Sequence, residues 1–249
     1  MPAPRWQRRA SLTFRCGIRT RFRRWICPRF SRVKKPDDEP PPSPLVAGFH
    51  SRGGLPHLKR EGASYFITFR LAGTLPAEVL QRFKVEREQL FAHALAAKRP
   101  LTWREEQEVF RWYGARVDAY LDAGRGDCFL RQPAIAELVS RALQFFHGQR
   151  YELPTWVVMP NHVHAVVHPL PGHTLSDIEH SWKSYTANRA NQLLQRVGQT
   201  FWQGECFDHL IRDDEDHARC CQYVTNNPVS AGLCERPEDW PWSSAHRPR

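Results

Sequence analysis

The chain has 249 residues, of which 41% are hydrophobic and 12% aromatic, and this composition suits one sizeable globular domain with or without a tail. No stretch approaches the roughly 18 consecutive apolar residues of a membrane-spanning helix, so we expect a soluble protein without a membrane partner. The net charge of +10 does not itself indicate a nucleic-acid partner, because residues 1–35 hold 12 of the 36 Lys and Arg residues and no acidic residue, which leaves 24 basic against 26 acidic residues.

The cysteine pattern indicates a cellular compartment but predicts no disulfide or metal site. Their number is odd and no two have the C-x-x-C spacing, so they predict neither a disulfide scaffold nor a zinc finger. A reducing, cytoplasmic location fits this pattern best. The seven residues are Cys16, Cys27, Cys128, Cys206, Cys220, Cys221 and Cys234.

Residues 1–45 form a basic and then proline-rich N-terminal tail, which we expect to be disordered. Its Arg-rich part fits a phosphate-binding arm, an organelle transit peptide or translated upstream sequence without a role, and the sequence leaves these alternatives open. The run KKPDDEPPPSPLVAG at 34–48 is typical of a linker, so we expect one domain over residues 46–249.

The first elements expected in the domain are a strand and several helices. Residues 63–71, ASYFITFRL, alternate apolar side chains with the period of two that is typical of a strand. A helix is expected after Pro76, and residues 100–127 predict a charged helix and loop in which we find no chemistry. Residues 133–147 carry apolar side chains at helical spacing and predict a core helix.

The stretch YELPTWVVMPNHVHAVVHP at 151–169 predicts two strands joined by a tight turn at Pro160 and Asn161. In the second strand Val163, Ala165 and Val167 share one face, which must be buried. His162 and His164 share the other face with Val166 and His168, and we expect them to point together away from the core. Their nitrogens can then converge on one divalent ion.

Two histidines alone do not define the chemistry of this strand. A HIT-type nucleotide hydrolase needs a third histidine where this chain has Val166, so that interpretation fails. A zinc hydrolase needs a further His, Cys or carboxylate ligand and an open position for water. Any remaining ligands must therefore come from elsewhere in the chain.

Two further helices complete the pattern. Residues 175–195 predict a long helix, followed by a loop that enters a strand within TFWQGECFDHLIR at 200–212. The acidic run DDED at 213–216 is typical of a helix start, and we expect this last helix to stop at Pro228. On it Tyr223 and Asn227 are four residues apart and lie on one face.

In this order the motifs WVVMPNHVHAVV, WKSY, FWQGECFDHLIRDDEDHARCCQYVTNNPVSAGL and WPWSS resemble the REP-associated tyrosine transposases, relatives of the single-tyrosine HUH transposases. The resemblance covers most of residues 50–245, but neither the tail nor residues 100–127. It implies an α+β, ferredoxin-like antiparallel sheet that carries the histidine pair, with helices packed on it. It also implies His162, His164 and Asn227 as ligands of Mg²⁺ or Mn²⁺, and Tyr223 as the nucleophile.

The expected function is therefore a metal-dependent DNA transposase or endonuclease. It would cleave and rejoin single-stranded, hairpin-associated DNA through a 5′-phosphotyrosine intermediate, as a monomer or homodimer. A phenol with a pKa of about 10 is a poor nucleophile at neutral pH, so a nearby cation or base must assist it. Tyr185 is a competing nucleophile, but it lacks a ligand residue four positions on.

Further residues are candidate DNA contacts, and two other functions are compatible with part of the pattern. Candidate phosphate contacts are Lys183, Arg189, Arg196 and Arg212, although a solvated helix face explains such charges equally well. Trp182 and Trp202 fit the core better than a stack on bases. One alternative function is a domesticated hairpin-DNA-binding protein that does not cut. Another, an unrelated small-molecule metallohydrolase, is disfavoured because no Asp or Glu adjoins the histidines in the sequence.

Overall fold

The structure is a computed structural model that describes residues 48–52, 55–59, 62–90, 92–97, 99 and 102–247. The tail of residues 1–45 and the expected domain start at residue 46 lie outside the described residues. Within the described part of the chain, no helix combines the length and apolar character needed to cross a membrane.

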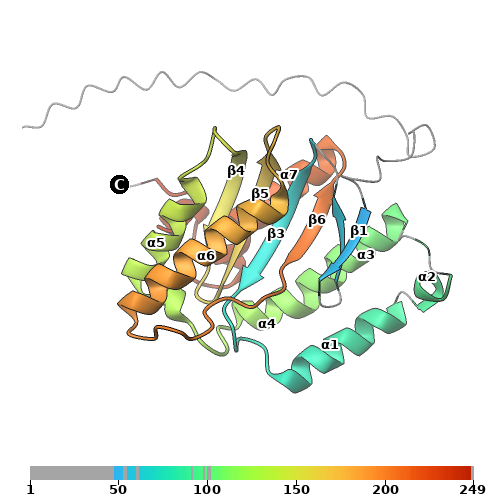
Figure 1. The fold of residues 1–249 in the computed structure, drawn as a ribbon, viewed down its shortest axis with the longest axis horizontal. Coiled ribbons are helices and arrows are strands. Elements are labelled where there is room, and N and C mark those ends of the chain that lie inside the picture. The colour runs from blue at the N-terminus through green and yellow to red at the C-terminus, as the bar shows by residue number, and fades with distance from the viewer. Residues whose placement is uncertain are drawn as a thin grey trace, which may run out of the picture.

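A four-stranded antiparallel sheet organises the domain (Figure 1). Its strand order is β4-β5-β3-β6, with bounds β3 Ser64–Arg70, β4 Tyr151–Val158, β5 His162–Pro169 and β6 Phe207–Ile211. Helix α5, Pro133–Gln144, leads from β3 to β4, and helix α6, Leu175–Leu193, connects β5 to β6. This succession and strand order define the ferredoxin-like arrangement, so the predicted fold class is confirmed.

The described part of the chain contains further elements outside this unit. A hairpin of β1, Gly48–Arg52, and β2, Leu55–Lys59, was not expected from the sequence, and β2 lies beside β6. The helices before α5 are α1 Ala77–Leu90, α2 Ala92–Ala96, α3 Trp103–Tyr113 and α4 Ala119–Asp122, with a π-helical turn, η2, at Gly114–Asp118. Short 3-10 turns are η3 Phe129–Arg131 and η4 Pro237–Asp239.

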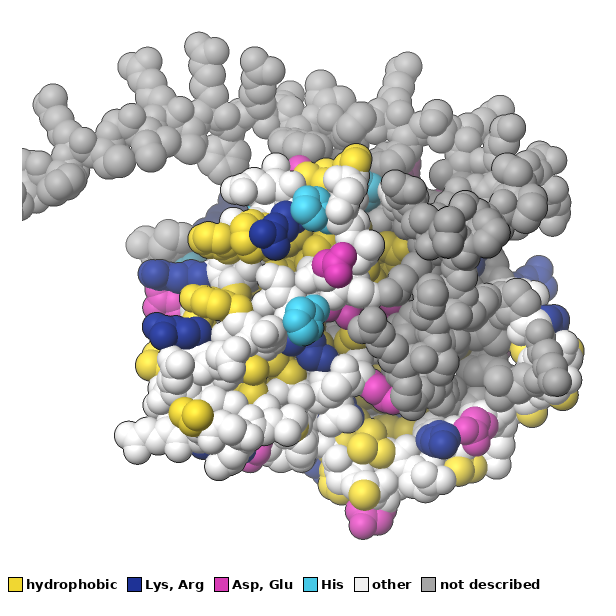
Figure 2. All heavy atoms as spheres, in the orientation of Figure 1, with side chains coloured by type: hydrophobic (Ala, Val, Ile, Leu, Met, Phe, Trp, Pro, Cys, Tyr) yellow, Lys and Arg dark blue, Asp and Glu magenta, His cyan; other side chains and the backbone are white. Residues whose placement is uncertain are grey.

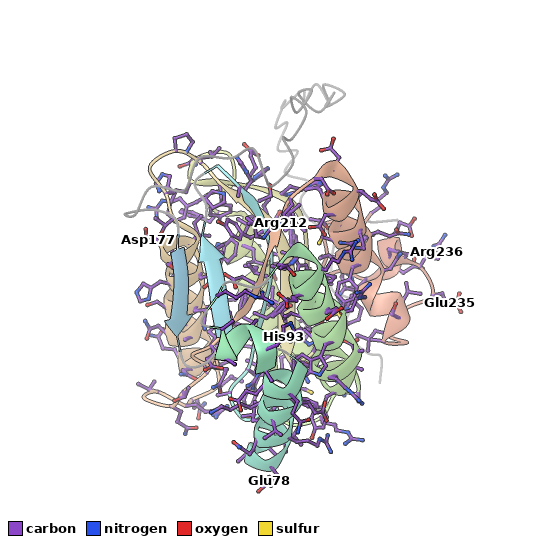
Figure 3. All side chains as sticks on the ribbon, turned by 90° about the vertical axis from the view of Figure 1, so that its right-hand side faces the viewer. Glu78, His93, Asp177, Arg212, Glu235 and Arg236 are labelled. Carbon is purple, nitrogen blue, oxygen red and sulfur yellow. The ribbon has the colours of Figure 1, made fainter. Side chains whose placement is uncertain are left out.

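Two hydrophobic cores cover the two faces of the sheet. Helices α5 and α6 pack against the face that carries Ile67 and Ala165, and α6 crosses in front of the strands in Figure 1. Helix α7, Asp214–Ser230, and the α3-η2-α4 segment cover the other face, which carries Phe66 and Val166. In the turned view, Asp177 of α6 and Arg236 beyond α7 accordingly lie on opposite sides of the molecule (Figure 3).

The predicted end of the last helix is wrong by two residues. Helix α7 continues through Pro228 to Ser230. The N–H of Ala231 donates to Asn227 O, and the N–H of Leu233 donates to Pro228 O, so hydrogen bonds close the last turn after the proline. Proline removes only its own N–H donor, and one missing bond near a helix end is tolerated. Asn227 therefore lies inside the helix rather than at its end.

Candidate active site

The candidate site begins with the histidine pair on β5, a central strand of the sheet. The tight turn at Pro160 and Asn161 starts this strand, and its alternation places His162 and His164 on the same face. Their Nε2 atoms are 2.9 Å apart. Both side chains are 0% exposed, and burial lowers the pKa of His162 to about 3 and that of His164 well below its ordinary range. Both imidazoles are therefore neutral at pH 7, the state in which histidine binds metals.

The expectation that these histidines point away from the core is wrong. The sequence pattern identifies one buried face of β5, but the opposite face is buried as well, under the second core. The ring of His164 stacks on Phe66 at a centroid distance of 5.6 Å and meets the ring of Tyr223 edge-on at 5.5 Å. The pair is thus enclosed between the sheet and α7.

Hydrogen bonds to the other ring nitrogens orient both imidazoles. The amide nitrogen of Asn161 donates to the carbonyl oxygens of Leu121 at 3.0 Å and Arg125 at 3.1 Å, so its oxygen faces His162. That oxygen accepts from His162 Nδ1 at 2.7 Å, which leaves the lone pair of this imidazole on Nε2. Outer hydrogen bonds of this kind orient metal-binding histidines.

Thr68 plays the corresponding role for His164. Its hydroxyl lies 2.7 Å from His164 Nδ1, and the two residues face each other in the β3–β5 register. A hydroxyl both donates and accepts, so Thr68 supports either tautomer of the ring. The structure therefore aims both Nε2 atoms at one point.

The tyrosine predicted as nucleophile lies beside this pair. Tyr223 extends from α7, and its Oη donates a hydrogen bond of 2.6 Å to Asp118 Oδ2. Burial, and then the charge of Asp118, raise the pKa of the phenol well above its ordinary value. Tyr185, the competing tyrosine, is 54% exposed on α6, which covers the opposite face of the sheet.

Two further side chains carry buried oxygen atoms that have no hydrogen-bond partner among the described residues. Asn227, one turn beyond Tyr223, is 2% exposed, and its Oδ1 has no partner among the described residues. Asp122 Oδ1 is likewise without a hydrogen-bond partner and lies 3.5 Å from His162 Nε2. Two neutral imidazoles and the nearby carboxylate oxygen of Asp122 form a donor set that fits a divalent metal ion. The carboxylate of Asp122 also removes the reason for disfavouring a metallohydrolase, because it adjoins the histidines in space.

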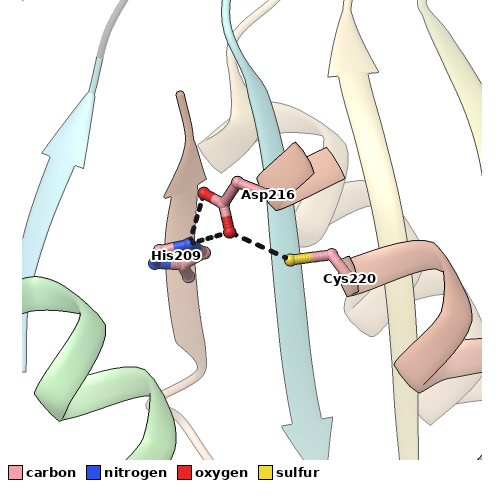
Figure 4. Close-up of side chains that lie close together, drawn as sticks. All are labelled: His209, Asp216 and Cys220. Carbon is pink, nitrogen blue, oxygen red and sulfur yellow. Dashed lines mark hydrogen bonds and ion pairs between the residues drawn. The ribbon is translucent and has the colours of Figure 1, made fainter. Parts of the chain in front are cut away.

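A second cluster joins His209, Asp216 and Cys220, whose possible ligand atoms all lie within 4.8 Å of one another (Figure 4). The carboxylate of Asp216 already accepts from His209 Nε2 at 2.9 Å, from the Arg219 guanidinium and from the backbone N–H of Arg212. Its oxygens are occupied, so the cluster acts as an ion-pair network. It attaches the start of α7 to β6.

The candidate phosphate contacts do not gather around the histidines. Lys183 and Arg189 extend from α6, and Arg196 follows this helix, on the far side of the sheet from the site. Lys183 Nζ donates to Gln203 O and Gly204 O, and the Arg196 guanidinium lies over the Phe129 ring. Arg212 is half-buried between β6 and α7. Figure 2 shows Lys and Arg side chains spread over the α5–α6 face rather than collected in one patch.

Sequence reasoning missed four residues of the site. Asn161 was interpreted as a turn residue only, and Asp118 and Asp122 lie in the segment where no chemistry was expected. Thr68 carried a weak signal, as a polar residue among the apolar side chains of its strand. By contrast, Trp182 and Trp202 are buried as expected, and their Nε1 atoms donate to Tyr151 and Thr186.

Part of the chain is similar to known transposases. Residues 129–227 match the family described as "Transposase IS200 like". The REP-associated tyrosine transposase of Escherichia coli (strain K12) is 30% identical over 98 residues, which are 39% of this chain and 56% of that protein. A Haemophilus influenzae protein named "Putative REP-associated tyrosine transposase" is 50% identical over 60 residues, which are 24% of this chain and 33% of that protein.

The matched part thus spans about half of the first relative and a third of the second. A solved structure of a REP-associated tyrosine transposase bound to a REP hairpin is also similar, with a TM-score of 0.41 and 16% identity over 79% of this chain and 82% of that one. The resemblance expected from the sequence is confirmed. Residues 129–227, which match the family model, include His162, His164, Tyr223 and Asn227.

Proposed function

We propose that this chain, a relative of the REP-associated tyrosine transposases, is a metal-dependent DNA transposase that cleaves and rejoins single-stranded, hairpin-associated DNA. The observation that carries the proposal is the placement of Tyr223 against a preorganised pair of buried imidazoles. The Nε2 atoms of that pair are 2.9 Å apart, and the ring centroids of His164 and Tyr223 are 5.5 Å apart.

His162, His164 and Asn227 would hold Mg²⁺ or Mn²⁺, with Asp122 available as a further oxygen donor. When bound, such an ion supplies Lewis-acid polarisation of the scissile phosphodiester. The contribution of the chain is to orient the two imidazoles through Asn161 and Thr68.

Tyr223 would attack the phosphorus atom through its phenolic oxygen. The new bond joins this oxygen to phosphorus, and the bond from phosphorus to the 3′ oxygen breaks. One DNA end then carries a free 3′-OH, and the other stays attached as a 5′-phosphotyrosine. Because the phosphotyrosine bond replaces the phosphodiester bond, rejoining requires no nucleotide cofactor.

Lys183, Arg189, Arg196 and Arg212 would contribute phosphate contacts that are independent of base sequence. The first three lie across the sheet from Tyr223, so we expect them to contact DNA away from the reacting phosphate. Replacing any one of them with Ala should weaken DNA binding uniformly across sequences and reduce its salt dependence.

The decisive experiment incubates the protein with labelled hairpin-bearing single-stranded DNA and Mn²⁺, followed by a denaturing gel. The DNA is taken from sequence flanking the protein's own gene. We expect a protein–DNA adduct that disappears in Tyr223→Phe and His164→Ala. It should persist in the matched control Tyr185→Phe, which removes an exposed hydroxyl. Binding without any adduct would instead favour the hairpin-binding protein that does not cut, and an adduct retained in Tyr223→Phe would reassign the nucleophile.

A further inference from the structure

The helical segment before the family-matched region contributes a carboxylate to the site. Asp118 ends the π-helical turn η2, and its Oδ2 accepts the hydrogen bond of 2.6 Å from Tyr223 Oη. Asp118 is 2% exposed, and its Oδ1 has no hydrogen-bond partner among the described residues. Residues 129–227, which match the family, do not include it. This segment therefore completes the environment of the phenol.

Local sequence explains why the backbone approaches the tyrosine here. Helix α3 begins with a capping box between Thr102 and Glu105 and ends at Tyr113, and the π-helical turn starts at the next residue, Gly114. A Cβ on Gly114 would lie 3.8 Å from Tyr223 Oη, so the glycine backbone passes directly beside the phenolic oxygen. Wide turns of this kind are frequent at functional sites because they redirect the side chains that follow.

Packing then holds Asp118 in place. Tyr113, just before the turn, stacks on Phe207 at a centroid distance of 3.9 Å, and Val117 and Leu121 are buried in the second core. The Leu121 carbonyl also accepts the hydrogen bond from the Asn161 amide, which orients His162. The element that positions Asp118 is thus attached to the element that positions the histidines.

We propose that Asp118 accepts the phenolic proton of Tyr223 during DNA cleavage, an inference that rests on the proposed function. The O–H bond of Tyr223 breaks and its proton moves to Asp118 Oδ2, while the phenolic oxygen bonds to phosphorus. The bond from phosphorus to the 3′ oxygen breaks, its electron pair stays on that oxygen, and the oxygen takes a proton from water. In rejoining, the 3′-OH attacks and loses its proton to water, and Asp118 returns its proton to the Tyr223 oxygen.

The groups around Asp118 favour a role as a proton acceptor over a role as one half of a structural ion pair. The ionisable groups that interact with Asp118 among the described residues are Tyr223, Tyr113 and Asp122, none of which is a cation. Burial raises the pKa of the Asp118 carboxyl, which makes it a stronger base than an exposed carboxylate. Asp216, in contrast, is bound by His209 and Arg219.

The first test measures single-turnover cleavage of the hairpin DNA by Asp118→Asn. A lost general base costs about 100-fold to 10,000-fold in rate, and we expect a fall in this range with DNA affinity unchanged. Asp118→Glu, which keeps a carboxylate, should recover part of the rate. The matched control Asp127→Asn changes an exposed aspartate of the same segment and should cleave like the unaltered chain. An unchanged or faster rate in Asp118→Asn would overturn the proposal.

A second test separates proton transfer from a structural role. Fluorotyrosine at position 223 lowers the pKa of the phenol and reduces its need for a base. It should therefore raise the rate of Asp118→Asn far more than that of the unaltered chain. Equal changes in both backgrounds would mean that Asp118 only positions the ring.

The fluorine also provides a readout that needs neither DNA nor metal. Its NMR resonance should shift on Asp118→Asn if the hydrogen bond exists in solution, and an unmoved resonance would contradict the contact. If the unaltered chain forms no adduct at all, the proposed function fails. If it forms one and Asp118→Asn does so equally fast, only this inference fails.

Discussion

Two buried polar clusters in this molecule both contain histidine and aspartate and differ in how completely the aspartates are hydrogen-bonded. Around Asp216, each carboxylate oxygen meets a cation or an N–H group, from His209, Arg219 and the Arg212 backbone. In the candidate active site, the Oδ1 atoms of Asn227, Asp118 and Asp122 have no hydrogen-bond partner among the described residues. Because buried polar atoms are normally satisfied, the unsatisfied cluster is the one with capacity for a ligand. Residue types alone would have favoured the other cluster.

The largest expected effect is a difference in the free energy of unfolding between a variant of the Asp216 cluster and a variant of the candidate active site. Asp216→Asn breaks a buried ion pair and should lower the free energy of unfolding by about 3 kcal/mol or more. Asp122→Asn, whose Oδ1 has no hydrogen-bond partner, should change it by less than about 1 kcal/mol. Urea unfolding monitored by tryptophan fluorescence measures both values. Equal losses would mean that the two carboxylates have the same structural role.

Mn²⁺ should stabilise the protein through the histidine pair alone. At a free concentration 100-fold above the Kd, a ligand that binds only the folded state adds about 2.7 kcal/mol to the free energy of unfolding. His164→Ala should abolish this increment. His209→Ala should lower the baseline stability but retain the increment. A loss of the increment in His209→Ala would move the metal to the second cluster.

A smaller effect should follow from the outer hydrogen bonds of the site. Thr68→Val removes the hydroxyl that contacts His164 Nδ1 and should weaken Mn²⁺ binding by about 10-fold to 100-fold. Isothermal titration calorimetry gives the affinity directly. Thr155→Val is a matched control, because Thr155 is a buried strand threonine whose hydroxyl contacts Ser244 instead. Equal weakening in both variants would contradict an orienting role for Thr68.

The smallest expected effect is the pH dependence of the free energy of unfolding in the metal-free protein. The pKa of His162 is about 3 in the folded chain and 6.5 ordinarily, so between these values the unfolded chain binds a proton that the folded chain does not. The free energy of unfolding should therefore fall as pH decreases from 6.5, by at most about 1.4 kcal/mol per pH unit from this group. Urea unfolding at pH 7, 6 and 5 with a chelator should show a weaker dependence in His162→Gln. The exposed control His180→Gln should behave as the unaltered chain, and an identical slope in all three proteins would refute the assignment.

The stabilising contribution of Asp216 is lost at a lower pH than that of His162. Burial opposes ionisation of this carboxyl, but the hydrogen bond and charge of His209, with Arg219, hold its pKa below the ordinary value of 3.8. Its contribution is present above that value and is lost as pH falls through the folded pKa. The Asp216 cluster should therefore begin to lose stability at a lower pH than the histidine pair.

The sequence by itself determined the features that depend on neighbours along the chain. The alternation in β5 placed His162 and His164 on one face, and helical spacing placed Tyr223 one turn before Asn227. The strand and helix patterns also placed most of the sheet strands and the helices α5, α6 and α7 along the chain, because periods of 2.0 and 3.6 residues are local properties. The ferredoxin-like sheet itself was expected only from the resemblance to the REP-associated tyrosine transposases.

Only the tertiary structure decided what surrounds these groups. It buried the histidine face under a second core, which the alternation of a single strand cannot reveal because both faces of β5 are covered. It also brought Asp118 to Tyr223 across 105 positions of the chain, through a π-helical turn held by packing against β6 and by the Asn161 amide. Contacts between residues so far apart arise from how separate elements pack, and no local period encodes them.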